Sequence, residues 1–135
     1  EREILFRVLQ GPLGWMLRDI ATPDAALARV GVAVNWLRTN FHKSVRIEEL
    51  AQMAALSVSA FHRHFKAVTA LSPLQFQKRI RLLNARYSLL AGEGNITSVA
   101  FGVGYESPAQ FSREYASFFG APPSKDIAGL RLRAF

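Results

Sequence analysis

The sequence contains no cysteine, and this absence removes several kinds of chemistry at once. Disulfides, thiolate zinc sites and cysteine nucleophiles are excluded, and the lack of cysteine suits a reducing compartment. No apolar run approaches the roughly 20 residues of a membrane-spanning helix. The first ten residues, EREILFRVLQ, do not have the pattern of a signal peptide. We therefore expect a soluble, cytoplasmic protein that does not interact with a membrane.

Acidic residues are also few, since ten Asp and Glu stand against 17 Lys and Arg, for a formal net charge of +7. The excess is concentrated in residues 41–91, which hold eight basic and two acidic side chains, while the flanking segments are close to neutral. Half of the 135 residues are hydrophobic, which is enough for one ordinary domain or two very small ones. A folded chain with a local basic excess favours a polyanionic partner.

Residues 47–66, IEELAQMAALSVSAFHRHFK, have the pattern of two short helices with a tight turn between them. Apolar residues follow helical spacing in the first half: Ile47, Leu50, Ala51 and Ala54. Ser57 is a good N-cap for the second helix. That helix should bury Phe61, Phe65 and Val68, and should expose Ser59, His62, Arg63 and Lys66. An exposed helix face with hydrogen-bonding and basic side chains is typical of a helix-turn-helix motif that enters a DNA major groove.

Longer helices are expected on both sides of this motif. Upstream, Thr22-Pro23-Asp24 is a strong helix start. This helix should end near Asn40 and bury Leu27, Val30, Val34, Leu37 and Phe41. Downstream, Ser72 and Gln75 predict a capping box around a helix that runs to about Leu90. We expect this helix to bury Phe76, Ile80, Leu83, Tyr87 and Leu90, and to have a basic exposed side with Lys78, Arg79, Arg81 and Arg86.

The second half of the chain repeats the first motif. Its first-helix positions recur 49 residues later, as Ile96, Val99, Ala100, Val103 and Gly104. Its second-helix positions recur 50 residues later, as Phe111, Arg113, Tyr115 and Pro123. One inserted residue in the second turn explains the change of offset, and a register kept on both sides of it indicates duplication. A second capping box, Ser107 with Gln110, should start a helix that buries Phe111, Tyr115 and Phe118 and exposes Ala109, Ser112, Arg113 and Ala116.

We therefore predict an all-α fold with two helix-turn-helix subdomains joined by a long linker helix, about seven helices in total, preceded by a short helical segment. The expected divisions are a remnant of a preceding regulatory domain at 1–21, the first subdomain at 22–71, the linker helix at 72–91 and the second subdomain at 92–135. A linker of about 17 to 18 residues is roughly 26 Å long. One DNA turn is about 34 to 36 Å, so the two recognition helices are expected in adjacent major-groove segments of an asymmetric site.

These motifs resemble the DNA-binding domain of the AraC/XylS family of bacterial transcription regulators. The resemblance covers about residues 24–127, through IEELAQMAALSVSAFHRHFK, SPLQFQKRIRLLNARYSLL and VAFGVGYESPAQFSREYASFFGAPP in that order. It implies a transcription regulator that binds double-stranded promoter or operator DNA and contacts RNA polymerase. It also implies that the effector and a dimer partner bind through an N-terminal domain. Its base-reading positions fall on Ser59, His62, Arg63, Pro108, Ala109, Gln110 and Arg113.

The sequence departs from the family pattern at several of these positions. Pro108 and Ala109 have no hydrogen-bonding side chain, so base readout by the second helix is expected from Gln110 and Arg113. Ala55 stands where the family usually has glycine, which costs about 1 kcal/mol if the backbone there is left-handed. Asp126 and the following isoleucine replace the Tyr-Arg often found after the last proline.

For the base-contact candidates Ser59, His62, Arg63, Gln110 and Arg113, less specific roles stay open. Either arginine can hold guanine O6 and N7 with its forked guanidinium, or can bind only phosphate. Gln110 can read a base, or can return to the backbone amide of Ser107 as part of the capping box. Contacts to the DNA backbone are expected from Ser57, Lys66, Lys78, Arg79, Ser107 and Ser112.

An enzyme is not expected, and neither is a cofactor or a metal. His62 and His64 lie two residues apart on a helix and diverge, unlike the two histidines of a zinc helix. The chain has no phosphate-binding loop. The main alternative is a helical protein-interaction module with a basic face that serves an acidic protein. RNA binding is a weaker option, because the exposed stripes lack aromatic side chains on which single-stranded bases stack.

Overall fold

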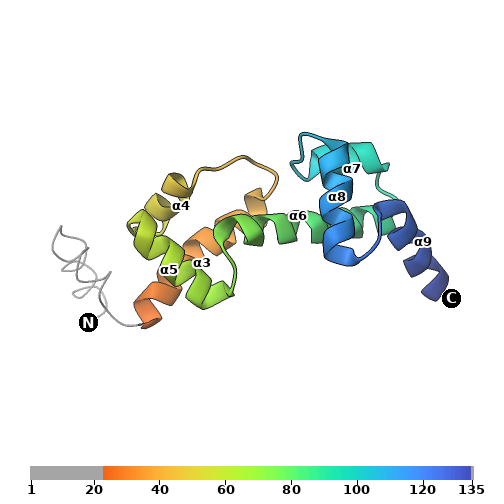
Figure 1. The fold of residues 1–135 in the computed structure, drawn as a ribbon. Coiled ribbons are helices and arrows are strands. Elements are labelled where there is room, and N and C mark those ends of the chain that lie inside the picture. Colours follow the sequence, from red (N-terminus) through yellow and green to blue (C-terminus); the bar gives the residue numbers. More distant parts are fainter. Residues whose placement is uncertain (1–22, 135) are drawn as a thin grey trace. The chain divides into compact units, whose positions relative to one another are not determined.

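The described part of the chain is entirely helical. The computed structural model describes residues 23–134, and the expected helical segment before them lies outside that range. The described residues form α3 (Pro23–Asn40), α4 (Ile47–Met53), α5 (Val58–Thr69), α6 (Pro73–Leu90), α7 (Ile96–Gly102), α8 (Pro108–Phe119) and α9 (Pro123–Arg133) (Figure 1). The all-α fold with about seven helices is thus confirmed. None of these helices is both long and apolar enough to cross a membrane.

The helices form two compact units, each with its own core. The first unit takes the described residues up to Thr39 together with Val45–Phe76, and so contains α3, α4, α5 and the start of α6. The second takes Asn40–Ser44 and the chain from Gln77 onward, with the rest of α6 and α7 to α9. The largest side chains of the two cores are aromatic and almost inaccessible: Phe61 and Phe65 in the first unit, and Phe111 and Tyr115 in the second.

Short polar side chains determine where several helices begin. The Ser57 hydroxyl accepts the backbone N–H of Ala60 at the start of α5 (Oγ···N 3.2 Å). At the start of α6, Ser72 accepts the N–H of Gln75, and the Gln75 side chain accepts the N–H of Ser72 in return. These bonds confirm the predicted cap and capping box, because each satisfies an amide that the helix itself leaves without an acceptor.

Burial confirms the duplication. Leu50, Ala51 and Ala54 of the first unit are buried, and so are their counterparts 49 residues later: Val99, Ala100 and Val103. Phe61 and Phe65 are also buried, and so are their counterparts 50 residues later, Phe111 and Tyr115. The connection between α4 and α5 spans residues 54–57, and that between α7 and α8 spans residues 103–107. The extra residue therefore lies in the second turn, as the change of offset predicts.

The repeat also includes the helices before each helix-turn-helix, beyond the part predicted from the sequence. Residues 29–37 read RVGVAVNWL and residues 81–89 read RLLNARYSL, with an offset of 52. The buried positions coincide: Val30, Ala33 and Leu37 in α3, and Leu82, Ala85 and Leu89 in α6. Each unit therefore contains a long first helix followed by a helix-turn-helix, and the second unit adds α9.

The buried positions of this repeat show that the predicted buried face of α6 is wrong. Leu83, Tyr87 and Leu90 are 48%, 71% and 40% exposed, and Phe76 and Ile80 are half-buried. Successive residues of a helix point about 100° apart, and α6 has two apolar stripes next to each other. The second core uses the stripe with Leu82, Ala85 and Leu89. Three other residues expected inside are also exposed, namely Leu27, Val68 and Phe118.

Candidate nucleic-acid interface

The first helix-turn-helix turns through a left-handed residue. Ala55 has φ 56°, a conformation in which an L-residue with a Cβ costs about 1 kcal/mol or more. The strain that the sequence predicts at this position is therefore present. Arg29 of α3, only 3% exposed, donates from Nη1 to the Ala55 carbonyl oxygen at 3.1 Å. A buried arginine beneath the turn thus holds the strained peptide in place.

The second turn uses glycine at the equivalent position. Gly104 has φ 107°, and a Cβ there would lie 2.7 Å from the His42 carbonyl oxygen and 2.8 Å from Arg81 Cζ. Arg81 occupies the position in α6 that Arg29 has in α3. Its guanidinium donates to the carbonyl oxygens of Phe41 and Lys43, at 2.6 and 3.2 Å. Burial lowers the pKa of Arg81. Arg81 therefore bonds to the connection between α3 and α4 and does not belong to an exposed basic side, contrary to our expectation.

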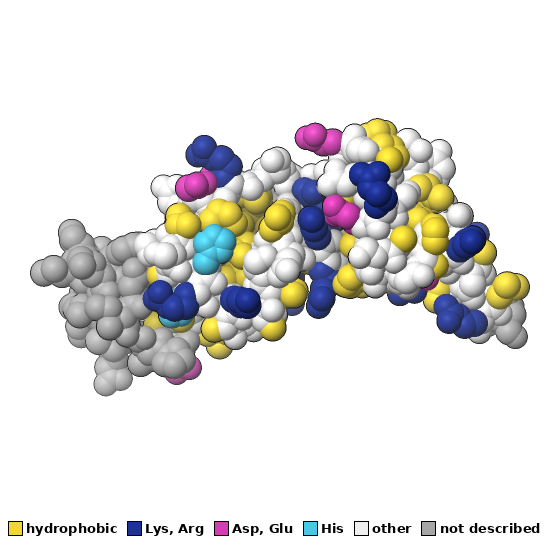
Figure 2. Space-filling view, in the orientation of Figure 1, with side chains coloured by type: hydrophobic (Ala, Val, Ile, Leu, Met, Phe, Trp, Pro, Cys, Tyr) yellow, Lys and Arg dark blue, Asp and Glu magenta, His cyan; other side chains and the backbone are white. Residues whose placement is uncertain are grey.

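Helix α5 presents the polar face that the sequence predicts. Ser59, His62, Arg63 and Lys66 are all exposed, while Ala60, Phe61 and Phe65 are buried. Within residues 23–134, no hydrogen bond or ion pair engages the Arg63 or Lys66 side chain. Lys, Arg and His side chains are visible on the surface of the first unit (Figure 2). The Ser57 hydroxyl is also exposed, and its proton remains able to donate while its oxygen caps the helix.

Helix α8 presents fewer hydrogen-bonding groups. Gln110 and Arg113 are exposed, and Ser107 and Ser112 are half-buried. Arg113 is the counterpart of Arg63 at an offset of 50, and it too has no ion pair within the described range. Alanines take the places that Ser59 and Lys66 have in the first unit. The second helix can therefore offer one arginine, one amide and the half-buried hydroxyl of Ser112, where α5 offers four exposed polar side chains.

Gln110 does not complete the predicted capping box. Its backbone N–H donates to the Ser107 hydroxyl at 3.2 Å, but its side-chain Nε2 donates to Glu114 Oε2 at 3.0 Å. Glu114 Oε1 accepts the Tyr105 hydroxyl at 2.7 Å, and Lys78 Nζ lies 3.5 Å from Oε2. Burial opposes ionisation of Glu114, but the hydrogen bonds from Tyr105 and Gln110 and the charge of Lys78 outweigh it. They keep the pKa of this carboxyl below its ordinary value.

A second acidic residue, Asp126 of α9, joins three helices. Arg86 of α6 donates to both of its carboxylate oxygens at 2.9 Å, and Tyr115 of α8 donates its hydroxyl to Oδ2 at 2.5 Å. The Arg86 guanidinium also lies 4.2 Å from the Phe119 ring centroid. Asp126 is the departure from the family pattern noted above, and the network gives it a structural role. Arg86 is therefore part of the packing, contrary to the exposed role expected from sequence.

The remaining basic residues of α6 also have contacts within the second unit. Lys78 is half-buried beside Glu114, and Arg79 is exposed with its guanidinium 5.3 Å from the Phe118 ring centroid. Both residues are candidates for contacts to the DNA backbone. Their positions leave Arg79 better exposed to solvent than Lys78. Neither Glu114 nor Asp126 was among our candidates, although Gln110 and Glu114 have the i, i+4 spacing at which helical side chains meet.

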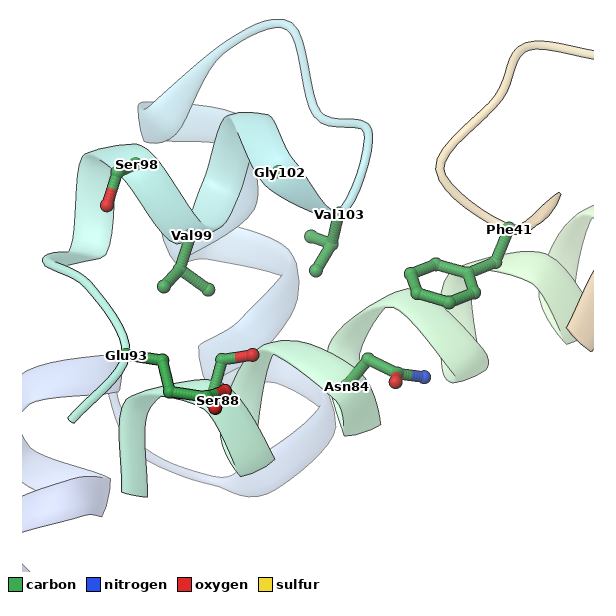
Figure 3. A pocket seen from close by; sticks show the side chains of 8 residues that line it. All are labelled: Phe41, Asn84, Ser88, Glu93, Ser98, Val99, Gly102 and Val103. Carbon is green, nitrogen blue, oxygen red and sulfur yellow. The ribbon is translucent and has the colours of Figure 1, made fainter. Parts of the chain in front are cut away.

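A cavity of about 360 Å³ lies in the second unit, away from these candidates. Its lining comes from α6, α7 and three connecting segments: Phe41, Asn84, Ser88, Glu93, Ser98, Val99, Gly102 and Val103 (Figure 3). Glu93 is the only titratable side chain in this lining.

Comparisons with known proteins identify relatives of this domain. Residues 50–127 match a family model described as a helix-turn-helix domain. The chain is 33% identical over 124 residues to the HTH-type transcriptional activator RhaS of Escherichia fergusonii. The matched region covers 90% of this chain and 44% of that relative. RhaS of Mannheimia succiniciproducens is 32% identical over 90 residues, covering 67% of this chain and 34% of that protein. The chain therefore spans less than half the length of these curated relatives.

Solved structures show the same fold. The DNA-binding domain of AdpA, described as a global transcriptional factor and crystallised with a target DNA, is 28% identical, with a TM-score of 0.72. The match covers 77% of this chain and 94% of that one. A probable AraC family transcriptional regulator from Rhodopseudomonas palustris is 26% identical, with a TM-score of 0.66 and coverage of 75% and 95%.

Proposed function

We propose that this chain reads duplex DNA with two recognition helices, α5 and α8. The chain belongs to the AraC/XylS family of DNA-binding transcription regulators. The family is one of transcription regulators and not of enzymes. In the proposed complex, α5 and α8 enter adjacent segments of the major groove. The direct base contacts come from Ser59, His62, Arg63, Gln110 and Arg113.

One observation carries this proposal: Arg63 and Arg113 occupy equivalent positions of two equivalent units, and both are exposed. Each lies on the solvent face of a helix whose opposite face is anchored by fully buried aromatic rings. An arginine so placed can hold guanine O6 and N7 with two parallel hydrogen bonds, worth about 1–3 kcal/mol of discrimination against another base. The same arrangement in both units favours two guanine-containing blocks in the binding site.

Phosphate contacts are proposed around each recognition helix. Ser57 and Ser107 cap the N-termini of α5 and α8, where backbone amides and the helix dipole favour an anion. Lys66 extends the same role along α5, as Ser112 does along α8. Arg79 is a further candidate on α6, and Lys78 is the weaker one, because the Glu114 carboxylate already lies beside its ammonium group.

The proposed spacing of the two blocks rests on the length of α6 alone. This helix has 18 residues, or about 27 Å at 1.5 Å per residue. That length is somewhat shorter than the roughly 34 Å of one DNA turn, so we expect adjacent grooves and a DNA bend that costs a few kcal/mol. Because α5 and α8 expose different side chains, one protomer should bind an asymmetric sequence.

The first unit should supply most of the affinity. It exposes two unpaired cations on its recognition helix, whereas the basic side chains of α6 are in contact with groups of the second unit. Arg63→Ala and Lys66→Ala should therefore weaken DNA binding much more than the matched pair Arg113→Ala and Lys125→Ala. Lys66→Ala should also reduce the slope of log affinity against log salt by about 1. Equal losses in the two pairs would contradict this distribution of affinity.

The decisive experiment is selection of bound sequences from a random duplex pool, with the chain at fixed salt. Two short conserved blocks about one helical turn apart are expected. A single block would mean that α8 does not read bases. Binding with no sequence preference, equal to binding of heparin at the same salt, would favour the alternative of a protein-interaction module with a basic face.

The activity of the whole protein is proposed from its longer relatives. RhaS is a transcriptional activator, and this chain covers 44% of that relative from Escherichia fergusonii. We propose that the intact protein acts in the bacterial cytoplasm and contacts RNA polymerase. An additional N-terminal domain would bind an effector and a dimer partner. A transcription assay with the intact protein, with and without its upstream region, tests these partners.

A further inference from the structure

The carboxylate of Glu114 connects the core of the second unit to an exposed residue of α8. On one side it accepts the hydroxyl of Tyr105, a residue that is 6% exposed and packs against the Phe111 ring at 5.3 Å between centroids. On the other side it accepts the amide of Gln110, one helical turn earlier on the same helix. The Glu114 side chain is 23% exposed, so both of its oxygens have defined partners in a largely enclosed position.

The chemistry of these groups determines the orientation of the Gln110 amide. A carboxylate only accepts hydrogen bonds, and the amide of glutamine has a donor end, NH₂, and an acceptor end, Oε1. The NH₂ end must therefore face Glu114. The carbonyl oxygen is left as the end that faces away from the carboxylate. A glutamine without such a partner can rotate and offer either end to a ligand.

We propose that Glu114 is a positioning residue that determines which end of the Gln110 amide meets the DNA. This inference rests on the proposed function, because it requires α8 to enter the major groove. A carbonyl oxygen accepts from the exocyclic amines of adenine and cytosine, whereas guanine and thymine offer only acceptors in that groove. Gln110 is therefore expected to select adenine or cytosine at its position, although a free glutamine would not exclude guanine or thymine.

Glu114→Gln is the most informative variant because it reverses the donor pattern without changing the size of the side chain. The ammonium of Lys78 lies 3.5 Å from the Glu114 oxygen that Gln110 uses and would hold an amide oxygen there, so Glu114→Gln is made together with Lys78→Met. In that background the new amide keeps its oxygen on the Tyr105 hydroxyl, which donates, and turns its NH₂ group toward Gln110. The Gln110 amide must then rotate to accept this bond and present its own NH₂ group to the groove. The preferred base should change from adenine or cytosine to guanine or thymine.

The experiment is selection from a duplex pool randomised only in the block read by α8, followed by affinity measurements on the four single-base variants of the site. For the unchanged chain we expect about a fivefold preference for adenine or cytosine, the low end for one specific base contact. Glu114→Gln should reverse the preference, and Glu114→Ala should abolish it. Gln110→Ala should abolish it as well, and combining it with Glu114→Ala should have no further effect.

Two controls separate positioning from charge and from folding. Glu106→Gln removes the same charge from an exposed residue just before α8, and it should leave the base preference unchanged. Tyr105→Phe keeps the core ring and the carboxylate but removes the anchor, so it should weaken the preference. Helix content by circular dichroism shows whether each variant is folded, and Tyr105→Phe tests the inference if Glu114→Ala does not fold.

The outcomes distinguish this inference from the function on which it rests. Reversal by Glu114→Gln, with loss in Gln110→Ala, supports it, since a purely structural role of Glu114 would not change which base is preferred. An unchanged preference in folded Glu114 variants overturns the inference and leaves the proposed function intact. Absence of any preferred base in the second block of the unchanged chain contradicts readout by α8 and overturns both.

Discussion

Replacing Asp126 with alanine is expected to lower the free energy of unfolding of the second unit by about 3 kcal/mol. This carboxylate, with a side chain only 6% exposed, holds together α6, α8 and α9. It accepts two hydrogen bonds from Arg86 and one from Tyr115. No other carboxylate in the described residues accepts a bidentate arginine, so the substitution leaves a cation and a hydroxyl without their acceptor.

The magnitude combines two costs that overlap. Removing one partner of a buried ion pair costs about 3–5 kcal/mol, and the low end applies because the Arg86 side chain is 29% exposed and can be partly rehydrated. The Tyr115 hydroxyl belongs to a residue that is 0% exposed, and a buried donor without an acceptor costs about 1–3 kcal/mol. Because both groups bond to the same carboxylate, the costs do not simply add.

Amide hydrogen exchange resolved by residue is the suitable assay, because it reports the two units separately. Protection in α8 and the C-terminal half of α6 should fall by a factor that corresponds to about 3 kcal/mol, or about 150-fold, while α3 to α5 serve as an internal reference. The triple variant Arg86→Met, Tyr115→Phe and Asp126→Leu should recover most of the loss, since apolar replacement of an entire buried network is often neutral.

The reasoning would be refuted by a loss below about 1 kcal/mol in Asp126→Ala, which is the range of an exposed ion pair. An equal loss of protection in α3 to α5 would also contradict it, because the carboxylate contacts only groups of the second unit. Asp126→Asn provides a milder variant, which keeps the volume and one acceptor oxygen.

The remaining predictions concern pH and the two turns. Burial opposes ionisation of Asp126, but the bonds from Arg86 and Tyr115 outweigh it and lower its pKa. Its contribution to stability should therefore be complete above about pH 5 and be lost as the pH falls through the folded-state pKa, and Asp126→Asn should remove this part of the acid-unfolding curve. Ala55→Gly should stabilise the first unit by about 1 kcal/mol in urea unfolding, because glycine adopts the left-handed conformation without strain. Gly104→Ala should destabilise the second unit by about 2 kcal/mol or more, since a Cβ would contact a backbone oxygen at 2.7 Å; equal effects of the two turn substitutions would contradict this contrast.

Comparison of the two units shows why the helices were predictable. Ser57 and Ser72 cap helices through bonds to residues only three positions away, so the signal is contained in a few neighbouring residues. The duplicated apolar pattern is equally local within each helix. Even the strain at Ala55 follows from one residue type at one turn position. All of these features depend on the order of residues along one helix or turn.

The buried face of α6 was predictable in principle but was assigned wrongly. Two adjacent apolar stripes run along this helix, and propensity does not distinguish them. The internal comparison of RVGVAVNWL with RLLNARYSL does distinguish them, because the arginine, alanine and final leucine align only in the register that buries Leu82, Ala85 and Leu89. The repeat upstream of each helix-turn-helix therefore carries the information that identifies the buried face.

The residues of the candidate site were also predictable from the sequence only in part. Exposure of Arg63 and Arg113 follows from helical periodicity around buried phenylalanine and tyrosine, and was correctly expected. The sequence does not indicate that Glu114 meets Tyr105 across a turn or that Asp126 meets Arg86 40 residues away. Such charges look like solvated surface in the sequence, because an ion pair between distant segments has no periodic pattern.

The order of residues was thus sufficient for the helices, their caps, the duplication and the outward stripes of α5 and α8, since each depends on spacing within one or two turns of helix. The packing of the units decided the rest: which stripe of α6 is buried, which arginines bond to backbone carbonyls or carboxylates, and that Tyr105 anchors Glu114. These features depend on contacts between segments 9 to 40 residues apart. Only the folded chain brings those segments within hydrogen-bonding distance.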